Sequence, residues 1–400
     1  MNELEFRAKR RLPTAIWTLG LVSLLMDVSS ELIHSLLPVF MVTVLGVSML
    51  TVGLIEGAAE ATALIVKVFS GVISDWWGKC KPLAVLGYSL GALSKPLFAM
   101  ASTTAMVVGA RLLDRVGKGI RGAPRDALVA DLVRPEMRGA AFGLRQSLDT
   151  VGSFLGPLLA MGLMLLWAND FRAVFWVATV PALLCVFLLV LGVHEPEKLD
   201  RPADAPRTQP LKRENLRRLN RGFAGVVVIG AMVTLARFSE AFLVLRAQQG
   251  GLALAWTPLV LIAMNVVYAL GAYPLGKLAD AVPHRQLLAL GLLVLIAADA
   301  LLALDNSGPV FWGGTLLWGL HMAMTQGLLA TMVADAAPAD LRGTAFGVFN
   351  LVCGVALLLA SALAGLLWDR LGASSTFLSG GAFALLAWLA LLWRGRASST

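Results

Sequence analysis

Apolar runs long enough to cross a lipid bilayer fill most of this sequence. A membrane-spanning helix needs about 20 mostly apolar residues. Hydrophobic residues make up 58% of the chain and charged residues only 14%, so little sequence remains for a soluble domain. We therefore predict an all-α integral membrane protein with twelve transmembrane helices, near residues 13–44, 52–74, 82–101, 104–130, 139–167, 172–193, 221–248, 257–279, 286–304, 309–335, 343–368 and 372–393.

A long polar stretch and an internal repeat divide these helices into two groups of six. The segments Asp131–Gly143 and Asp335–Gly347 align without gaps and share Asp, Arg, Gly, Ala, Phe and Gly at fixed spacing. Parallel repeats of this kind are typical of transporters that rock two bundles around a central site. The predicted organisation is an N-terminal six-helix bundle (1–193), a cytoplasmic linker (194–220) and a pseudo-symmetric C-terminal six-helix bundle (221–400).

The distribution of basic residues predicts topology and narrows the partners. The net charge is +8, but Lys and Arg lie in alternate short connections, and the opposite connections, such as Gly46–Thr51 and Gly250–Trp256, have none. By the positive-inside rule, both termini are expected in the cytoplasm. The expected location is a bacterial-type inner (plasma) membrane. This pattern argues against nucleic-acid binding. The isolated cysteines show no redox or metal spacing, and no cofactor is expected.

Charged residues inside the predicted spans are the strongest indication of function. Such charges are costly at membrane depth and usually face an aqueous path or an opposite charge. A nearby base favours an ionised carboxylate and burial favours the neutral acid, so motion between two environments can load and release a proton. The residues predicted to take part in proton coupling are Asp27, Glu31, His34, Glu56, Glu60, Arg111, Asp114 and Arg115. Alternatively, these ions only neutralise one another and hold the helices together.

Other polar residues in the spans are candidates for a substrate cavity. The second half is poorer in charge than the first, which favours an amphiphilic or partly apolar solute. The predicted cavity residues are Lys118, Arg145, Asp149, Arg237, Glu240, Asn265, Tyr268, His321, Gln326 and Asn350. Arg237 and Glu240 are three positions apart on a helix and can instead simply pair with each other.

A charged hinge between the second and third spans resembles the loop signature of the major facilitator superfamily. Its matching residues are Gly71, Asp75, Gly78, Lys79 and Lys81, whereas Trp76 and Cys80 depart from the signature. The resemblance implies alternating access, with the loop Asp acting as a latch at a helix end of the other half. A weaker echo in the second half ends at Asp280. The predicted latch residues are Gly71, Asp75, Gly78, Lys79, Arg138, Asp280 and Arg342.

The fifth span resembles the glycine-rich motif of proton-driven exporters. Gly143, Gly152, Gly156 and Pro157 match its spacing, although Ala160 and Met161 replace its terminal glycine pair. Small residues on one stripe let helices approach closely, so ordinary tight packing is the alternative explanation. Asp27–Glu31 and Asp114–Arg121 are similar to segments of nickel-resistance exporters in the same superfamily. That similarity makes a metal or metal-chelate cargo possible, but metal ligands stay unassigned.

The main hypothesis is a secondary active transporter that exports a small solute in exchange for protons. The cargo is a drug-like compound, a metal or a metal chelate. Proton-coupled uptake of an organic anion by the basic fourth span is the alternative. A membrane-embedded enzyme or a channel is a distant third, since no catalytic motif is found. The expected partners are the solute, protons and the lipid bilayer, with the protein acting as a monomer.

Overall fold

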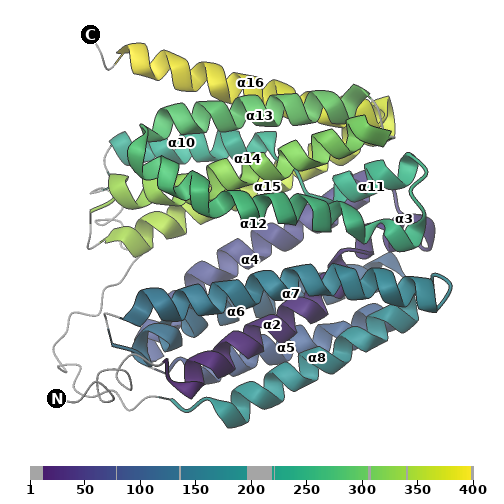
Figure 1. Cartoon of the computed structure of the whole chain (residues 1–400), viewed down its shortest axis with the longest axis vertical. Helices are drawn as coiled ribbons and strands as arrows, with labels where there is room; N and C mark the ends of the chain where they lie inside the picture. The colour runs from purple at the N-terminus through teal and green to yellow at the C-terminus, as the bar shows by residue number, and fades with distance from the viewer. Residues whose placement is uncertain are drawn as a thin grey trace. The chain divides into compact units, whose positions relative to one another are not determined.

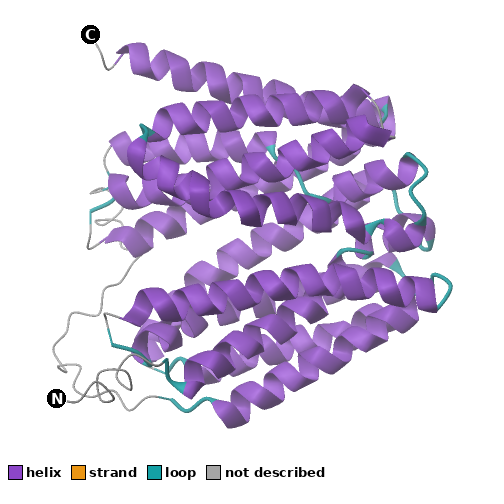
Figure 2. Cartoon of the chain, in the orientation of Figure 1, coloured by secondary structure: helices purple, strands orange, loops and turns teal. Residues whose placement is uncertain are grey.

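The computed structural model describes residues 12–77, 79–134, 137–195, 219, 221–304, 308–338 and 341–397 (Figure 1). Regular structure in these residues is helical, joined by short loops (Figure 2). The helices of the first half are α2 (Thr14–His34), α3 (Leu37–Thr43), α4 (Met49–Trp77), α5 (Lys81–Met100), α6 (Thr104–Asp131), α7 (Arg138–Leu166) and α8 (Phe171–Gly192). Those of the second half are α10 (Arg221–Ala236), α11 (Ala241–Gln249), the 3₁₀ turn η2 (Leu254–Trp256), α12 (Pro258–Ala281), α13 (His284–Leu304), α14 (Gly308–Ala336), α15 (Arg342–Leu371) and α16 (Ala373–Ala397).

The prediction of an all-helical membrane fold is confirmed. In the described residues, 11 stretches are long and apolar enough to cross a membrane. They correspond to the predicted spans except the fourth, which forms the helix α6. Its basic stripe makes α6 too polar to qualify by composition, although it is as long as its neighbours. Both copies of the internal repeat join consecutive helices, α6 to α7 and α14 to α15.

Two of the predicted spans are interrupted, which the sequence analysis did not anticipate. The first consists of α2 and α3, and Pro38 lies in the first turn of α3, where its missing N–H costs nothing. The seventh consists of α10 and α11, separated at residues 237–240. At that break the backbone N–H of Ser239 donates to the Ser361 hydroxyl at 3.1 Å instead of continuing a helix.

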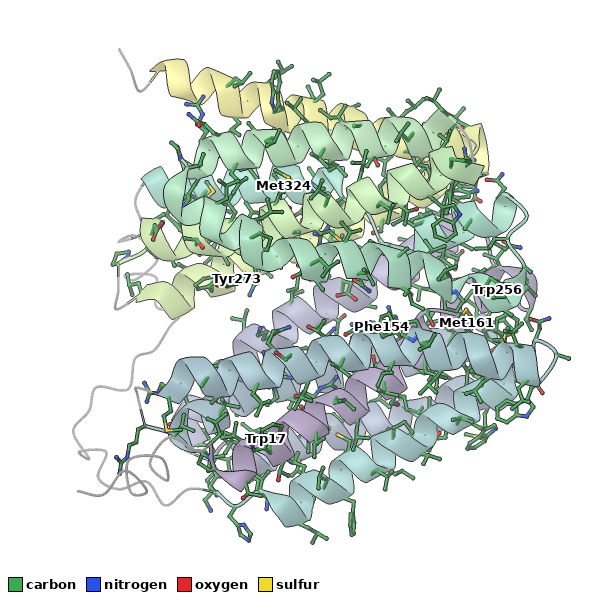
Figure 3. The ribbon with its side chains drawn as sticks, viewed as in Figure 1. Trp17, Phe154, Met161, Trp256, Tyr273 and Met324 are labelled. Carbon is green, nitrogen blue, oxygen red and sulfur yellow. The ribbon has the colours of Figure 1, made fainter. Side chains whose placement is uncertain are left out.

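The chain divides into two compact units. Unit 1 contains the described residues within 1–34, 66–159 and 170–209, and unit 2 contains those within 35–65, 160–169 and 210–400. In unit 1, α5 packs against α6 and α8, and α2 packs against α8. In unit 2, α13 lies between α14 and α16, and α10 packs against α15 and α16. Side chains in unit 2 range from the buried Met324 to Tyr273, which is 71% exposed (Figure 3).

Within unit 2, the first half of α4 packs closely against α15. A Cβ added to Gly57 would lie 2.8 Å from Cα of Leu358, and Gly53 and Gly365 are similarly tight against Ser361 and Met49. At the end of this seam, the carboxylate of Asp369 accepts hydrogen bonds from the backbone N–H groups of Met49 at 3.0 Å and Leu50 at 2.9 Å. Asp369 therefore caps the amino end of α4 from another helix.

A second carboxylate caps the amino end of α5 in unit 1. Glu195 accepts hydrogen bonds from the backbone N–H groups of Cys80 at 2.7 Å and Lys81 at 2.8 Å. The Lys81 ammonium donates to the Val190 carbonyl at 2.9 Å, near the end of α8. Because Pro82 has no N–H to offer, these contacts serve the free donors of the first turn. The chain after α8 is thus tied to the start of α5.

Candidate functional site

A buried ion cluster centred on Asp114 joins three helices of unit 1. The Lys95 ammonium of α5 donates to Asp114 Oδ1 of α6 at 2.7 Å, and His34 Nε2 of α2 lies 3.3 Å from Asp114 Oδ2. Arg115 Nε lies 3.8 Å from the same oxygen. Lys95 and Asp114 are almost fully buried. We call His34, Lys95, Asp114 and Arg115, together with Glu31, the Asp114 cluster.

His34 stands between a base and an acid within this cluster. Its Nδ1 accepts from Arg115 Nη2 at 3.2 Å and lies 3.8 Å from Glu31 Oε1. Because a guanidinium only donates, this contact requires an unprotonated Nδ1 and leaves the imidazole proton on Nε2, facing Asp114. A second proton on Nδ1 would break the Arg115 contact and favour Glu31. The geometry therefore allows His34 to exchange partners when it is protonated.

Lys95 was missed by the sequence analysis. It is a single Lys in an otherwise apolar span, followed by Pro96, and an isolated charge in a span is a signal for a functional or paired residue. Besides Asp114, its ammonium donates to the Ser30 hydroxyl of α2 at 3.0 Å. Lys95 thereby connects α5 to the two helices α2 and α6, which carry the acids of the cluster.

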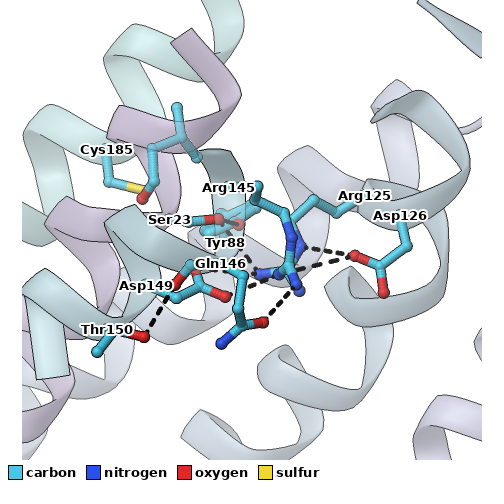
Figure 4. Close-up of polar contacts among 10 residues, drawn as sticks. Ser23, Tyr88, Arg125, Asp126, Arg145, Gln146, Asp149, Thr150 and Cys185 are labelled. Carbon is cyan, nitrogen blue, oxygen red and sulfur yellow. Dashed lines mark hydrogen bonds and ion pairs between the residues drawn. The ribbon is translucent and has the colours of Figure 1, made fainter. Parts of the chain in front are cut away.

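A second ion cluster lies where α6 and α7 meet (Figure 4). Arg145 donates to Asp149 at 2.8 Å and to Gln146 at 2.9 Å, and Arg125 donates to Asp126 at 3.2 Å. Arg145 also lies 3.8 Å from Asp126. We call Arg125, Asp126, Arg145 and Asp149 the Arg125 cluster. Arginines and carboxylates alternate in it, so each charge lies beside an opposite one.

The Arg125 cluster also reaches the helices α2 and α5. Arg125 donates to the Ser23 hydroxyl at 3.3 Å, and Ser23 lies 3.4 Å from the Tyr88 hydroxyl. The guanidinium of Arg121 stacks over the Tyr88 ring at 5.0 Å. Arg145 and Asp149, predicted as cavity residues, are therefore in an ion network, and Ser23, Tyr88 and Asp126 are members that the sequence analysis did not include.

The glycine-rich stripe of α7 lies against the acidic face of α2. A Cβ on Gly152 would be 2.9 Å from Cβ of Asp27, and one on Gly156 would be 2.7 Å from Cβ of Glu31. Gly143, in contrast, has no neighbour within 4 Å at its Cβ position. The two glycines that match the exporter motif in mid-helix thus hold α7 directly against the predicted coupling acids, with Pro157 next in α7.

The remaining coupling candidates separate into two groups. The coupling candidates Arg111 and Arg115 are buried in α6, whereas Lys118, which was predicted as a cavity residue, is exposed on the same helix. Lys118 is within electrostatic range of both Asp27 and Glu31. Glu56 and Glu60 lie on the part of α4 that belongs to unit 2, so the acids of the first two spans do not form one compact group within unit 1.

Two of the cavity candidates of unit 2, Arg237 and Glu240, lie in the break between α10 and α11. Arg237 is within electrostatic range of Tyr268 and His321. His321 is fully buried, and its Nδ1 lies 2.8 Å from the Gly291 carbonyl, as expected for a histidine with a structural contact. Glu240 also lies in range of Tyr268. The other candidates are half-buried on their helices: Asn265, Gln326 and Asn350.

The predicted latch residues are only partly described. Gly71 lies in α4, Lys79 is exposed, and Arg138 Nε donates to the Ala130 carbonyl at 3.3 Å. Gly78 lies outside the described residues. The structure describes the helices that contain Asp75, Asp280 and Arg342 but not the side chains of these three residues. Residues 196–218 and 220 of the predicted linker also lie outside the described residues.

Metal-ligating side chains do not gather anywhere in the described chain. No group of three or more His, Cys, Asp or Glu residues there has the spacing to hold an ion. The cysteines Cys80, Cys185 and Cys353 are buried and separate. The Asp114 cluster places three basic side chains beside two acids.

Comparison with known proteins identifies the family to which the fold corresponds. The sequence profile of the Major Facilitator Superfamily matches residues 19–356 and 241–400. An uncharacterized MFS-type transporter of Methanocaldococcus jannaschii is 31% identical over 96% of each chain. The multidrug resistance protein MdtH of Yersinia enterocolitica is 30% identical, over 42% of this chain and 40% of its own.

Solved structures give the same fold. The nucleoside transporter NupG aligns with a TM-score of 0.81 at 13% identity, over 94% of this chain and 99% of the other. The human organic anion transporter MFSD10 aligns with a TM-score of 0.64 at 20% identity, over 94% and 99% of the two chains. At these identities the likeness concerns the fold and not the cargo.

Proposed function

The chain belongs to the major facilitator superfamily of membrane transporters, and on that premise we propose that it exports a small solute in exchange for protons. A multi-pass transporter acts on a small-molecule or ionic substrate. The direction of transport, the coupling to protons and the residues involved are the proposal. We also propose that the carrier consists of two six-helix halves, lies in the inner membrane with both termini in the cytoplasm and acts as a monomer.

The observation that carries the proposal is the position of His34 Nδ1 between Arg115 and Glu31. With distances of 3.2 Å to the guanidinium and 3.8 Å to the carboxylate, a proton on Nδ1 changes which partner His34 favours. In this proposal, Glu31 accepts the incoming proton. His34 then changes its contacts, and through them the protonation of Glu31 affects Asp114 and Arg115. Lys95 keeps Asp114 ionised and in place throughout, because its ammonium is 2.7 Å away.

The glycines of α7 can couple this proton step to movement of the helix. Gly156 lies against Glu31 and Gly152 lies against Asp27, so a change in the charge or position of either acid acts directly on the backbone of α7. Helices packed through glycines can slide without side chains in the way. We propose that Asp27 and Glu31 are the proton carriers and that α7 transmits their state to the rest of the carrier.

Export is favoured over import by the relatives. MdtH is named a multidrug resistance protein, and its similarity covers 42% of this chain. The exporter-like spacing of Gly143, Gly152, Gly156 and Pro157 agrees with that direction. The cargo class that we propose is a drug-like organic compound, as the name of that relative suggests, with a metal or a metal chelate as the other candidates.

Uptake of an organic anion is the second candidate, and it is favoured by the exposed Lys118 next to the buried Arg111 and Arg115. The two candidates differ in the direction of solute movement relative to the proton gradient. With purified protein in liposomes, tetraphenylphosphonium and benzoate serve as cation and anion probes. Both probes also cross lipid unaided, so only the flux in excess of that in protein-free liposomes counts. Excess movement of the cation against the proton flux supports export, whereas excess movement of benzoate with the protons supports uptake.

The coupling role is tested by Glu31→Gln. We expect this variant to lose gradient-driven transport in liposomes while keeping its fold and its binding of tetraphenylphosphonium, since Gln preserves shape but carries no exchangeable charge. Asp131→Asn, which changes an exposed carboxylate at the end of α6, is the matched control and retains transport. Gradient-driven transport at the wild-type rate by Glu31→Gln would remove Glu31 from the proposed role.

A further inference from the structure

A solitary carboxyl group is sealed inside unit 2. Asp299 lies on α13 and is 0% exposed. Neither Oδ1 nor Oδ2 has a hydrogen-bond partner in the described part of the chain. Buried polar groups are nearly always hydrogen-bonded, so each exception needs a physical reason. The proposed export mechanism makes no use of Asp299.

The carboxyl rests on a glycine pair of α16 beside the break in the seventh span. A Cβ on Gly380 would lie 2.7 Å from Asp299 Oδ2, 3.0 Å from Phe238 Cε1 and 3.2 Å from the Ala236 carbonyl oxygen. A Cβ on Gly381 would lie 3.6 Å from Cβ of Asp299. The carboxyl is therefore close to the last carbonyl of α10, where that helix stops.

Aromatic side chains occupy the same region. The ring of Phe238 lies 5.3 Å from that of Trp318 and 5.5 Å from that of Phe377. Trp318 is fully buried, and its Nε1 also has no hydrogen-bond partner in the described residues. These rings exclude water from the neighbourhood of Asp299 without offering it a hydrogen bond.

The charged groups around Asp299 are directed elsewhere. From α11, Arg246 donates to the Leu302 and Ala303 carbonyls at the carboxyl end of α13, at 3.0 and 3.4 Å. From the break, Arg237 is in range of Tyr268 and His321, and Glu240 is itself an acid. From α14, His321 contacts the Gly291 carbonyl. The described side chains of α16, in residues 373–392, include no charged group.

Among the described residues, an ionised carboxylate at this position has neither a counter-ion nor a hydrogen-bond donor, and desolvating such a charge is prohibitive. Binding one proton turns the carboxylate into a neutral acid and removes that cost. A proton also needs no cavity, which suits a side chain with 0% exposure. We propose that Asp299 is a proton-binding site of unit 2, separate from the acids of the Asp114 cluster.

Asp299 lies beside the point where the seventh span is interrupted, so its proton is held next to the α10–α11 break. The described surroundings of Asp299 are sealed by α16 and by the aromatic rings, so exchange of the proton with water requires these elements to move. Interrupted membrane helices are places where backbone and ions meet in transporters. A second proton site in unit 2 gives the carrier a proton that is bound and released independently of Glu31.

Infrared difference spectroscopy of the full-length protein in lipid nanodiscs tests the proposal. At neutral pH, the wild type is expected to show a carbonyl band of protonated carboxylic acid that Asp299→Asn lacks, with a loss equivalent to one acid per chain. The control Asp335→Asn changes a side chain that is 62% exposed and leaves the band intact. Glu31→Gln also leaves the Asp299 contribution intact, so failure of the proposed coupling role is distinguishable from failure of this inference.

Two results would overturn the assignment. One is an Asp299→Asn spectrum in which a carboxylate band, and not an acid band, is lost at neutral pH. The other is a sodium-dependent rise in the thermal midpoint of the wild type that Asp299→Asn abolishes, which would assign the site to a metal cation. Should Asp299→Asn not fold, Asp299→Ser is measured in its place and must lose the same acid band.

Discussion

Replacing Gly156 with alanine tests whether α7 is held against the coupling acids by the absence of a side chain. The added Cβ would lie 2.7 Å from Cβ of Glu31, 2.9 Å from the Val28 carbonyl oxygen and 3.1 Å from the Leu32 nitrogen. Ordinary carbon contacts are about 3.5–4.0 Å, and two of the three neighbours are backbone atoms that cannot rotate away. The two helices must therefore separate by about 1 Å, and overpacking of this kind costs about 1–3 kcal/mol.

The matched control is Gly162→Ala on the same helix, where the new Cβ has no neighbour within 4 Å. Alanine is favoured over glycine in a helix by about 1 kcal/mol at either position, so that gain cancels when the two variants are compared. We expect Gly162→Ala to melt at or above the wild-type temperature and Gly156→Ala to melt clearly below Gly162→Ala. Gly156→Ala should also transport more slowly in liposomes. Equal melting temperatures together with equal transport rates would refute the close approach of α7 to Glu31.

Other substitutions test the ion cluster, the helix cap and the latch. Lys95→Met leaves Asp114 buried without its cation and should lower the free energy of unfolding by about 3–5 kcal/mol, seen as a lower thermal midpoint. Adding Asp114→Asn should recover much of the lost stability. A further, additive loss in the double variant would argue against the pairing. Asp369→Ala removes the cap of α4 and should cost about 0.5–2 kcal/mol in the same assay, whereas an unchanged midpoint would mean that the cap contributes nothing. Asp75→Asn should slow exchange between the two facing states, and unchanged populations in a spin-label distance measurement across the cytoplasmic rim would contradict its latch role.

The helices were predictable because their signal is local. A run of about 20 apolar residues between polar connections defines a span without knowledge of its neighbours. The charged span α6 was predicted in the same way, although its basic residues make it more polar than the other spans. The break at residues 237–240 was not predicted. The contact found there is made by Ser361, which is distant in sequence and whose hydroxyl accepts from the Ser239 N–H.

The sequence predicted most residues of the candidate site but not which of them pair with each other. Glu31, His34, Asp114 and Arg115 were chosen from their spacing on two helices, and the structure brings them together. The main partner of Asp114 is Lys95, which no periodicity on α2 or α6 indicates. The sequence also shows an acidic face on α2 and a glycine stripe on α7 as two separate features. Only the packed structure reveals that these two surfaces contact each other.

The carboxylate of Glu195 has a practical consequence for anyone who attaches a label or a fusion partner to this carrier. Its two oxygens hold the Cys80 and Lys81 amides, so the chain is anchored at that point whatever is joined beyond it. A cut or insertion before Glu195 would release the start of α5, next to the hinge that ends α4. One placed after it would leave that anchor intact and is the better position for a reporter.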